Sequence, residues 1–514
     1  MSLGDVPAIR PVGFQAILTW GVEMTKKLRT FLVLAAVLPL ASCSGPKSGG
    51  GGGGGGGGTG NANVSVTLYD TPPKGVTLLS FSLPIVGISL TPASGSPVSI
   101  YSPTTPLPFE LTRLETDSAA VVTAASVPAG TYTALSVTIG ASSGVFVNYS
   151  GAAIGSCAVG GVCNLPSGAA TTVTVPLSLT LTSNQNQWIG LDVNLSNAIV
   201  TTGGIGVDFT QAKTFAATTT VRTGLPTGAV DTIEDYIGTV TAVSSSSITV
   251  QSGMTGQSFT AAITASTEID AAPSIYSNCN SATPSSCLVV GSVVSLDATL
   301  AAAGTFAATE IDILDVAATD EIEGVIYPTA STATTGIVGM ILADKVSKTG
   351  NAVLGASTTT YGTGIFLTAG PSINYSMDTK TLTNAPSFVP FGFAGSGDLL
   401  AGQVIRAQVT GVTSNSSGIS ATATNVILRW SRVSATVNLV TGTSFTMTNI
   451  PAYISTLNQQ LDITPQVYTY SPGTAFDGVT GPADTNFQNA SVAIRALYLN
   501  NNAPAFQAAK VRVP

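Results

Sequence analysis

Strict alternation of apolar and polar residues constrains the fold of this chain more than any other feature. In TVTVPLSLTLT, residues 172–182, nearly every second residue is Val or Leu, and most residues between them are Thr or Ser. The same period of two occurs in VSVTLYD at 64–70 and in WIGLDVNL at 188–195. This period gives a strand one apolar and one polar face, as in antiparallel strands half covered by a partner sheet. The sequence therefore predicts an all-β protein.

Composition excludes several classes of function. The 514 residues include 26 acidic and 18 basic ones, and no basic run interleaved with aromatics could neutralise a row of phosphates. We therefore expect no nucleic-acid partner. The chain has no histidine, which removes the usual general base of serine and cysteine nucleophiles. We expect no catalytic residues and a protein that is not an enzyme.

A basic segment followed by an apolar one predicts a signal peptide near the N-terminus. Lys26, Lys27 and Arg29 precede the apolar stretch 31–40. Ten residues are too few to span a bilayer but suit the apolar core of a secretory signal. We assign 24–42 to the signal peptide. Residues 1–23 then form an upstream extension, with Met24 as the expected start.

The end of this segment, LASC at residues 40–43, resembles the lipobox of bacterial lipoproteins. The resemblance implies cleavage between Ser42 and Cys43 and attachment of a diacylglyceryl group to the Cys43 sulfur. By the same resemblance, Ser44 after the cysteine implies export to the outer membrane, with the leaflet left open. The alternative is that Cys43 is a free cysteine in a short apolar helix.

Ten consecutive glycines at 49–58 follow this cysteine. Glycine has no side chain to pack and loses much conformational freedom when ordered, so such a run behaves as a flexible coil. We predict that residues 43–61 are a tether between the lipid and the folded domains.

The remaining four cysteines fall into two close pairs, Cys157 with Cys163 and Cys279 with Cys287. Each interval contains turn-forming residues, so each pair can close a local disulfide loop in an oxidising compartment. The alternative is one four-cysteine metal site, which the long separation between the two pairs disfavours.

Residues 62–225 form the first predicted domain, a β-sandwich. Four stretches occur in order within it: VSVTLYDTPP, FELTRLET, VPAGTYTALSVTIG and WIGLDVNLSNAIV. They resemble an uncharacterised bacterial lipoprotein domain family over about 62–215. The resemblance implies a sandwich and transfers no active site. The piece PAGTY, 128–132, is also similar to prealbumin-like and carboxypeptidase-regulatory sandwiches.

The rest of the chain is repetitive. Three stretches beginning at residues 237, 322 and 433 each open with a strand and a hairpin, and Val293, Val404 and Val492 mark equivalent positions in the closing strands. Small antiparallel barrels of OB type suit modules of this size and remove sheet edges, and sandwiches are the alternative. The opening hairpins resemble a second uncharacterised small-barrel family. We predict module 1 at 226–318, module 2 at 319–429 with an insertion near 345–385, and module 3 at 430–514.

Carboxylates gather at the expected module junctions. Asp231, Glu234 and Asp235 lie where the first domain meets module 1, and a larger group lies where module 1 meets module 2. The larger group could bind Ca²⁺, which takes six to eight oxygen ligands, and a solvated strand edge is the alternative. The candidate calcium ligands are Glu310, Asp312, Asp315, Asp320, Glu321 and Glu323.

Four aromatic residues are candidates for stacking on sugars, with core packing as the alternative: Trp188, Trp430, Tyr468 and Tyr470. The whole pattern predicts a lipid-anchored outer-membrane protein facing the periplasm or the medium. We expect it to bind polysaccharide, peptidoglycan or an envelope protein. A structural spacer without a small ligand is the alternative, and a carboxylate-dependent glycoside hydrolase is a weaker one.

Overall fold

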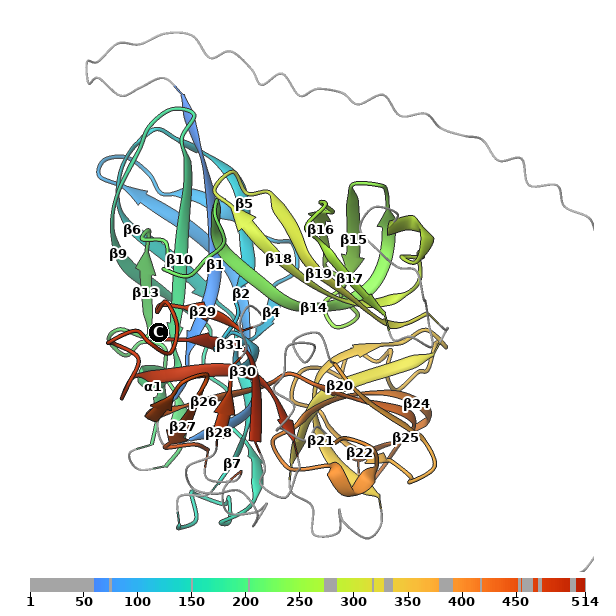
Figure 1. The fold of residues 1–514 in the computed structure, drawn as a ribbon. Coiled ribbons are helices and arrows are strands. Elements are labelled where there is room, and N and C mark those ends of the chain that lie inside the picture. Colours follow the sequence, from blue (N-terminus) through green and yellow to red (C-terminus); the bar gives the residue numbers. More distant parts are fainter. Residues whose placement is uncertain are drawn as a thin grey trace, which may run out of the picture. The chain divides into compact units, whose positions relative to one another are not determined.

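The computed structural model describes residues 60–513, apart from 74–75, 149–150, 202–203, 272–283, 317–318, 328–335, 379–391, 417, 452–453, 455–465, 470–473 and 500–504. Strands dominate this part of the chain, which confirms the all-β prediction (Figure 1). The predicted signal peptide, Cys43 and all but the last two residues of the predicted tether lie outside the described residues, and Asn61 already belongs to strand β1. Among the residues described, no helix is long and apolar enough to cross a membrane.

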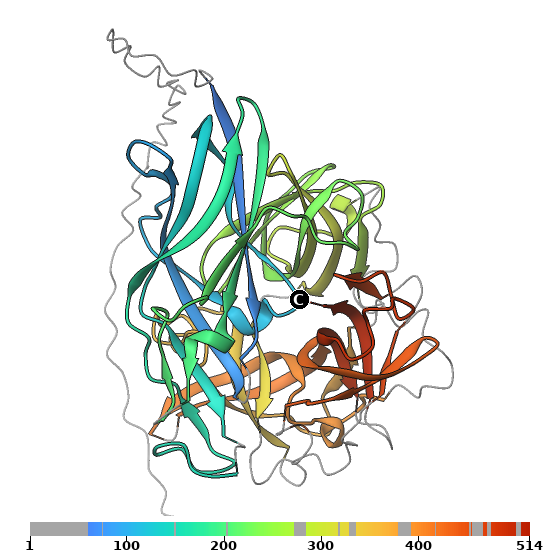
Figure 2. The same ribbon diagram turned by 90° about the vertical axis from the view of Figure 1, so that its left-hand side faces the viewer.

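The first domain is a sandwich of two sheets that share one hydrophobic core. One sheet has the order β13 (Phe215–Thr218), β10 (Asn186–Asn194), β1 (Asn61–Thr71) and β5 (Ala119–Pro128). The main path of the other is β8 (Val162–Asn164), β7 (Ser143–Val147), β2 (Thr77–Pro92), β6 (Gly130–Ile139) and β9 (Thr171–Leu181), with β3 (Val98–Tyr101) and β4 (Leu107–Glu110) also paired to β2. Figure 2 shows its long strands, coloured blue to green, along their length. As the alternation predicts, Val64, Val66 and Leu68 are fully buried in this core.

The four-stranded sheet contains a parallel pair that the alternation did not reveal. Strand β1 is antiparallel to β5 but parallel to β10, from Asn63 opposite Asn186 to Thr71 opposite Asn194. Parallel neighbours cannot be joined by a tight hairpin, and here the intervening chain builds most of the other sheet. Both kinds of strand have a period of two, so the pattern alone cannot distinguish them.

Two short helical turns connect strands of the sandwich. The 3₁₀ turn η1 (Leu111–Arg113) follows β4, and the Glu110 carboxylate caps it by accepting a hydrogen bond from the Thr112 amide. A single turn α1 (Leu195–Ala198) follows β10 and leads into the small pair β11 (Ile199–Val200) and β12 (Gly206–Val207). Charged side chains of η1 and of the residues after it contact the later modules: Arg113 donates to the Asp235 carbonyl, while Glu115 and Asp117 accept from Ser434 and Arg432.

Module 1 is a closed ring of five strands. Its strands are β14 (Ala229–Val243), β15 (Ser247–Gln251), β16 (Ser258–Ala262), β18 (Val293–Ala301) and β19 (Phe306–Asp315), and β17 (Glu268–Ala271) also pairs with β19. All neighbours in the ring are antiparallel except β16 and β19, which close it in parallel. Directions can alternate all the way round only with an even number of strands, so a five-stranded ring needs one parallel pair. This arrangement is a small barrel of the predicted OB-like kind.

Modules 2 and 3 repeat this ring. Module 2 consists of β20 (Asp320–Tyr327), β21 (Ile337–Val346), β22 (Gly364–Thr368), β24 (Val404–Asn415) and β25 (Gly418–Arg429), with β23 (Asn374–Met377) beside β25. Module 3 consists of β26 (Ser431–Thr441), β27 (Ser444–Thr448), β28 (Gln466–Tyr468), β30 (Ser491–Leu499) and β31 (Ala505–Arg512), with β29 (Ala475–Asp477) beside β31. In both, the third and last strands of the ring pair in parallel. Isolated 3₁₀ turns lie at η2 (Pro284–Ser286) and η4 (Ser396–Asp398).

Almost no chain separates one module from the next. Strand β19 ends at Asp315 and β20 begins at Asp320, while only Trp430 lies between β25 and β26. Such short connections place the last strand of one module directly before the first strand of the next. Charged residues at these strand ends are therefore brought to the seams between modules.

Candidate functional site

The few charged residues of the chain are concentrated at the seams between modules. Each of the seven arginines after residue 60 forms an ion pair with a carboxylate. Their side chains are at most 16% exposed. We call these arginines, a nearby lysine and their acidic partners the charge cluster. Its cations are Arg113, Arg222, Arg406, Arg429, Arg432, Arg495, Lys510 and Arg512.

Asp235 of module 1 is the most connected acid of the charge cluster. It lies in a bulge of β14, where the register against β18 shifts between Ile233 and Tyr236. Its φ of +51° is in the left-handed region, which Asp and Asn enter more readily than most residues. Bulges re-aim side chains, and this one turns the Asp235 carboxylate toward the arginines of modules 2 and 3.

Three arginines donate hydrogen bonds to this carboxylate. Arg429, the last residue of β25 in module 2, lies 3.1 Å from Oδ1 through Nη2. In module 3, Arg495 Nη2 lies 2.8 Å from Oδ1 and Arg432 Nη2 lies 2.5 Å from Oδ2. One side chain of module 1 is thus bonded to both other modules.

Module 3 presents a row of positive charges to these acids. In the register of β26, β30 and β31, Arg432 lies opposite Arg495, and Arg495 lies opposite Lys510. Like charges in opposed positions destabilise a sheet unless acids neutralise them. The neutralising acids come from other modules: Lys510 Nζ lies 2.9 Å from Glu234 Oε1, and Arg495 Nη1 lies 3.2 Å from Asp297 Oδ2.

Burial and ion pairing shift the pKa values of the two bulge acids in opposite directions. Burial opposes ionisation of Asp235, but Arg495, Arg432 and Arg429 outweigh it and hold its pKa well below the usual range. Burial raises the pKa of Glu234 to about 8, against the attraction of Lys510. Burial and the neighbouring cations thus have opposite net effects on the pKa values of these two adjacent carboxyl groups.

The sandwich is joined to the charge cluster through η1 and the residues that follow it. Arg432 Nε donates to Asp117 Oδ2 at 3.0 Å, and Arg113 Nη2 lies 3.3 Å from Glu323 Oε1 of module 2. Arg222, which precedes module 1, pairs with Asp231 at 2.8 Å and with Asp477 of module 3 at 3.2 Å. The cluster thus connects the sandwich with all three modules.

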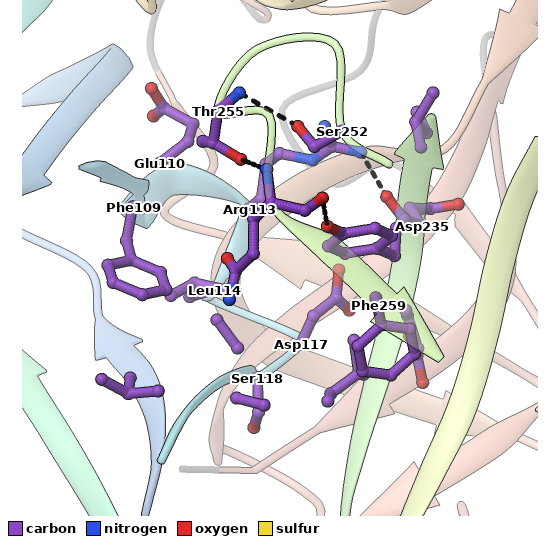
Figure 3. A pocket seen from close by; sticks show the side chains of 18 of the residues that line it. Phe109, Glu110, Arg113, Leu114, Asp117, Ser118, Asp235, Ser252, Thr255 and Phe259 are labelled. Carbon is purple, nitrogen blue, oxygen red and sulfur yellow. Dashed lines mark hydrogen bonds between the residues drawn. The ribbon is translucent and has the colours of Figure 1, made fainter. Parts of the chain in front are cut away.

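A cavity of about 420 Å³ lies beside the charge cluster, lined mostly by the sandwich and module 1 and also by Asp344 and Tyr361 of module 2. Figure 3 shows the side chains around it, with Phe109, Leu114 and Ser118 coming from the sandwich and Asp235 and Phe259 from module 1. Phe259 lies between two other rings, with centroids 5.0 Å from Tyr236 and 4.5 Å from Phe306. This volume and mixed lining are typical of small-molecule sites, which measure about 300–1,000 Å³.

The carboxylates in the cavity wall are already bonded within the protein. Glu110 accepts hydrogen bonds from Ser80 Oγ at 2.6 Å and from the Phe81 amide at 2.7 Å. Asp117 and Asp235 are held by arginines as described above. The wall is therefore suited to holding a ligand by shape and hydrogen bonding.

The six carboxylates proposed as calcium ligands do not converge on one point. Asp320 accepts from the backbone amides of Lys348 and Thr349 at 2.8 and 2.9 Å. Asp315 accepts from the Thr319 hydroxyl. The other three acids after Glu310 face arginines: Asp312 faces Arg429, Glu321 faces Arg406, and Glu323 faces Arg113, Arg406 and Arg429.

Glu310 lies instead in a small acidic group with Glu268 and Asp270. The ligand oxygens of these three residues all lie within 4.8 Å of one another. The parallel pairing of β17 with β19 places Glu268 directly opposite Glu310. Glu310 is one of the predicted calcium ligands, whereas Glu268 and Asp270 come from β17, a separate segment of the module that nothing in the sequence places beside β19.

The cysteine pairs differ in how much of them the structure describes. Cys157 and Cys163 form a disulfide, as predicted, with their Cα atoms 6.0 Å apart. Cys287 is buried, while its predicted partner Cys279 lies outside the described residues.

The candidate sugar-stacking tryptophans are structural. Trp188 is buried with Val230 and Leu300 of module 1, and its indole Nε1 donates to Thr67 Oγ1 at 3.0 Å. Trp430 is also buried, and the Arg495 guanidinium lies 5.2 Å from its ring centroid. Tyr468 is in β28, and Tyr470 is outside the described part of the chain.

Two family models match the chain. Residues 61–209 match the model described as Domain of unknown function (DUF4382), and residues 237–312 match the model described as Domain of unknown function (DUF5666). The first match covers most of the sandwich and the second covers most of module 1. A search of curated proteins found no match. Both resemblances to uncharacterised families are thus confirmed at the level of domains of unknown function.

The sequence indicated that acids gather at the junctions, but it revealed neither their arginine partners nor the aromatic wall of the cavity, formed by Tyr236, Phe259 and Phe306. One usable signal was present: Arg495 interrupts the apolar run SVAIRALYL, 491–499, in which the neighbouring residues Ile494 and Ala496 are core residues. An arginine within such a run indicates a covered outer face. No comparable signal marks Phe259, which alternates like any other core residue of its strand.

Proposed function

We propose that the protein is a lipid-anchored outer-membrane protein that binds a component of the cell envelope and does not catalyse a reaction. The observation that carries the proposal is the cavity between the sandwich and module 1. Its walls come from separate modules, and the charge cluster fixes those modules to one another. A pocket held in this way is preorganised, which lowers the entropic cost of binding.

The tether and lipid part of the proposal rests on the sequence. The lipobox resemblance supports acylation of Cys43, and the glycines at 49–58 would give the folded part freedom to move at the membrane surface. More than one acyl chain on a single cysteine holds a protein to a bilayer far more firmly than one chain does. A binding site on such a tether can reach polymers near the membrane.

Two observations favour binding over catalysis. The five carboxylates in the cavity wall, Glu110, Asp117, Glu234, Asp235 and Asp344, are each bonded to internal donors. The chain also offers no histidine to act as a general base. An acid–base mechanism would need at least one carboxyl group free to exchange a proton with a substrate.

The test of this proposal combines localisation with capture. In cells that make the full chain, the wild type should fractionate with outer membranes and incorporate labelled fatty acid, and Cys43→Ser should do neither. The purified full chain should also be retained by isolated envelope polysaccharide or by peptidoglycan sacculi. Membrane retention of Cys43→Ser would contradict the anchor, and absence of retention on every envelope polymer would contradict the binding function.

A structural spacer is the second candidate, and the charge cluster is the observation that favours it. Ion pairs connect the sandwich with all three modules, as expected of a rigid strut. The two functions separate in a variant whose cavity is filled. A spacer keeps its cellular role when the cavity is blocked, whereas a binding protein loses it.

A further inference from the structure

We infer that the cavity between the sandwich and module 1 is a binding site for a neutral saccharide, with the aromatic wall of module 1 against the apolar face of a sugar ring. The inference rests on the proposed binding function and adds the chemical class of the ligand. Three properties of the cavity carry it: its aromatic wall, its internally neutralised charges, and the polar groups at its rim.

Aromatic side chains supply part of the apolar lining of the cavity. Phe259 is flanked by Tyr236 and Phe306, and the Tyr236 hydroxyl is fixed by donating to the Gln257 carbonyl at 2.7 Å. Phe109 contributes a further ring from the sandwich. Aromatic side chains combine a large apolar surface with defined geometry, and the C–H face of a pyranose is apolar in the same way.

The charges around the cavity disfavour a charged ligand. Arg113 is the cation in the wall, and it is engaged by Glu323 and by the Asp235 carbonyl oxygen at 3.0 Å. Asp235 itself is held by three arginines. An anionic ligand would meet no unpaired cation in the described wall. A cationic ligand would have to compete with the internal donors that already bind the wall's carboxylates, such as the hydroxyl and amide on Glu110 and Lys510 on Glu234. A neutral ligand needs no counter-charge from the wall and displaces none of its ion pairs.

The rim offers groups that suit sugar hydroxyls. The Thr123 and Ser258 hydroxyls and the Gln257 side-chain amide line the cavity, and none of them has a hydrogen-bond partner among the described residues. Each of these groups can both donate and accept. A sugar hydroxyl has the same dual capacity, so the rim can bind several hydroxyl orientations without a fixed charge.

Thr123→Trp is the variant that tests the site. Thr123 is an exposed residue of β5 whose side chain lines the cavity, so a Trp there occupies ligand space without disturbing a core. The matched control is Thr133→Trp. Thr133 belongs to β6, the strand that follows β5 in the chain; it is also exposed and lines none of the described cavities. Binding to the full chain is measured by calorimetry with cellotetraose, chitotetraose and maltotetraose, and with tetragalacturonate as an anionic probe.

We expect at least one neutral oligosaccharide to bind the wild type and the Thr133→Trp control equally. Thr123→Trp should bind it at least about tenfold more weakly, a loss of about 1.4 kcal/mol. The inference is overturned if no neutral oligosaccharide binds, if Thr123→Trp binds as the wild type does, or if the anionic probe binds as tightly. Retention on envelope polymers without any oligosaccharide binding would overturn this inference alone and leave the proposed function standing.

Discussion

Arg432 and Arg495 lie directly opposite each other on strands β26 and β30, and the carboxylate of Asp235 accepts hydrogen bonds from both guanidinium groups. Two opposed arginines repel each other in a sheet. Asp235, the acid that compensates both of them, belongs to module 1 and lies 197 residues before Arg432 and 260 residues before Arg495. The outer face of module 3 can therefore be buried only when module 1 is docked against it.

Replacing Asp235 by Asn should destabilise the protein by about 3–5 kcal/mol, because it leaves buried arginines without their shared counter-charge. Asn tolerates the left-handed backbone of this position as Asp does, so the substitution changes charge rather than conformation. The free energy of unfolding is measured by urea denaturation. Lys213→Gln removes an exposed charge and should change stability by no more than about 0.5 kcal/mol. A loss below about 1 kcal/mol for Asp235→Asn would refute this account.

Stability should fall as pH rises through the titration of Glu115. Burial raises the pKa of Glu115 to about 7, although Ser434, Arg432 and Arg512 act in the opposite direction. The folded-state pKa lies above the unfolded value of about 4.3, so this contribution is complete below pH ~4.3 and is lost as pH rises toward 7.

The neutral variant Glu115→Gln isolates this effect, because its amide oxygen can still accept the Ser434 hydrogen bond, which is 2.6 Å long in the wild type. Between pH ~4.3 and ~7 the stability of the variant relative to the wild type should improve by roughly 3 kcal/mol. Denaturation curves at several pH values measure this difference. A difference that stays constant over the interval would show that Glu115 titrates as it does in the unfolded chain.

The seam between modules 1 and 2 should not tolerate a side chain at Gly253. A Cβ atom added there would overlap the carbonyl oxygen of Lys345 in β21. We expect Gly253→Ala to cost about 1–3 kcal/mol and to make the seam more susceptible to limited proteolysis. Gly370→Ala is the control, since its added Cβ would have no neighbour within 4 Å. Equal melting temperatures for the two variants would contradict the close approach.

The Cys157–Cys163 disulfide should contribute about 2 kcal/mol, as expected for a short loop closed by a cross-link. Replacing both cysteines by Ser should lower stability by this amount. Peptide mass analysis should show that this pair reacts with an alkylating reagent only after reduction. Alkylation of both thiols in the unreduced protein would exclude the bond.

The interior of each module was predictable from the sequence, but the contacts between modules were not. Alternation places Val433 and Ile494 inside module 3, where the structure has them. The same alternation places Arg432 and Arg495 on the outer face, but it does not show which module covers that face. The docking of whole modules decides which outer faces meet, and a period of two in the sequence carries no information about that docking.

The acids of the charge cluster were visible in the sequence, but their partners were not. The sequence indicated that acids gather at the junctions, and calcium was the counter-charge proposed for the larger group. In the structure, Glu321 and Glu323 are paired with arginines from distant positions, Arg406 among them. A counter-charge supplied by the chain itself is hard to see when the cation is some eighty residues away, as Arg406 is from both acids.

Strand β1 also determines how the domain would respond to a mechanical load. Any pull transmitted through the residues before Asn61 enters β1, which is paired on both sides, with β10 in parallel and with β5 antiparallel. A force along the strand strains the rungs of both ladders together, in shear, whereas a force on an edge strand can open its rungs one at a time. A pulling force at the N-terminus of the sandwich therefore acts on a strand that resists it through two hydrogen-bonded ladders at once.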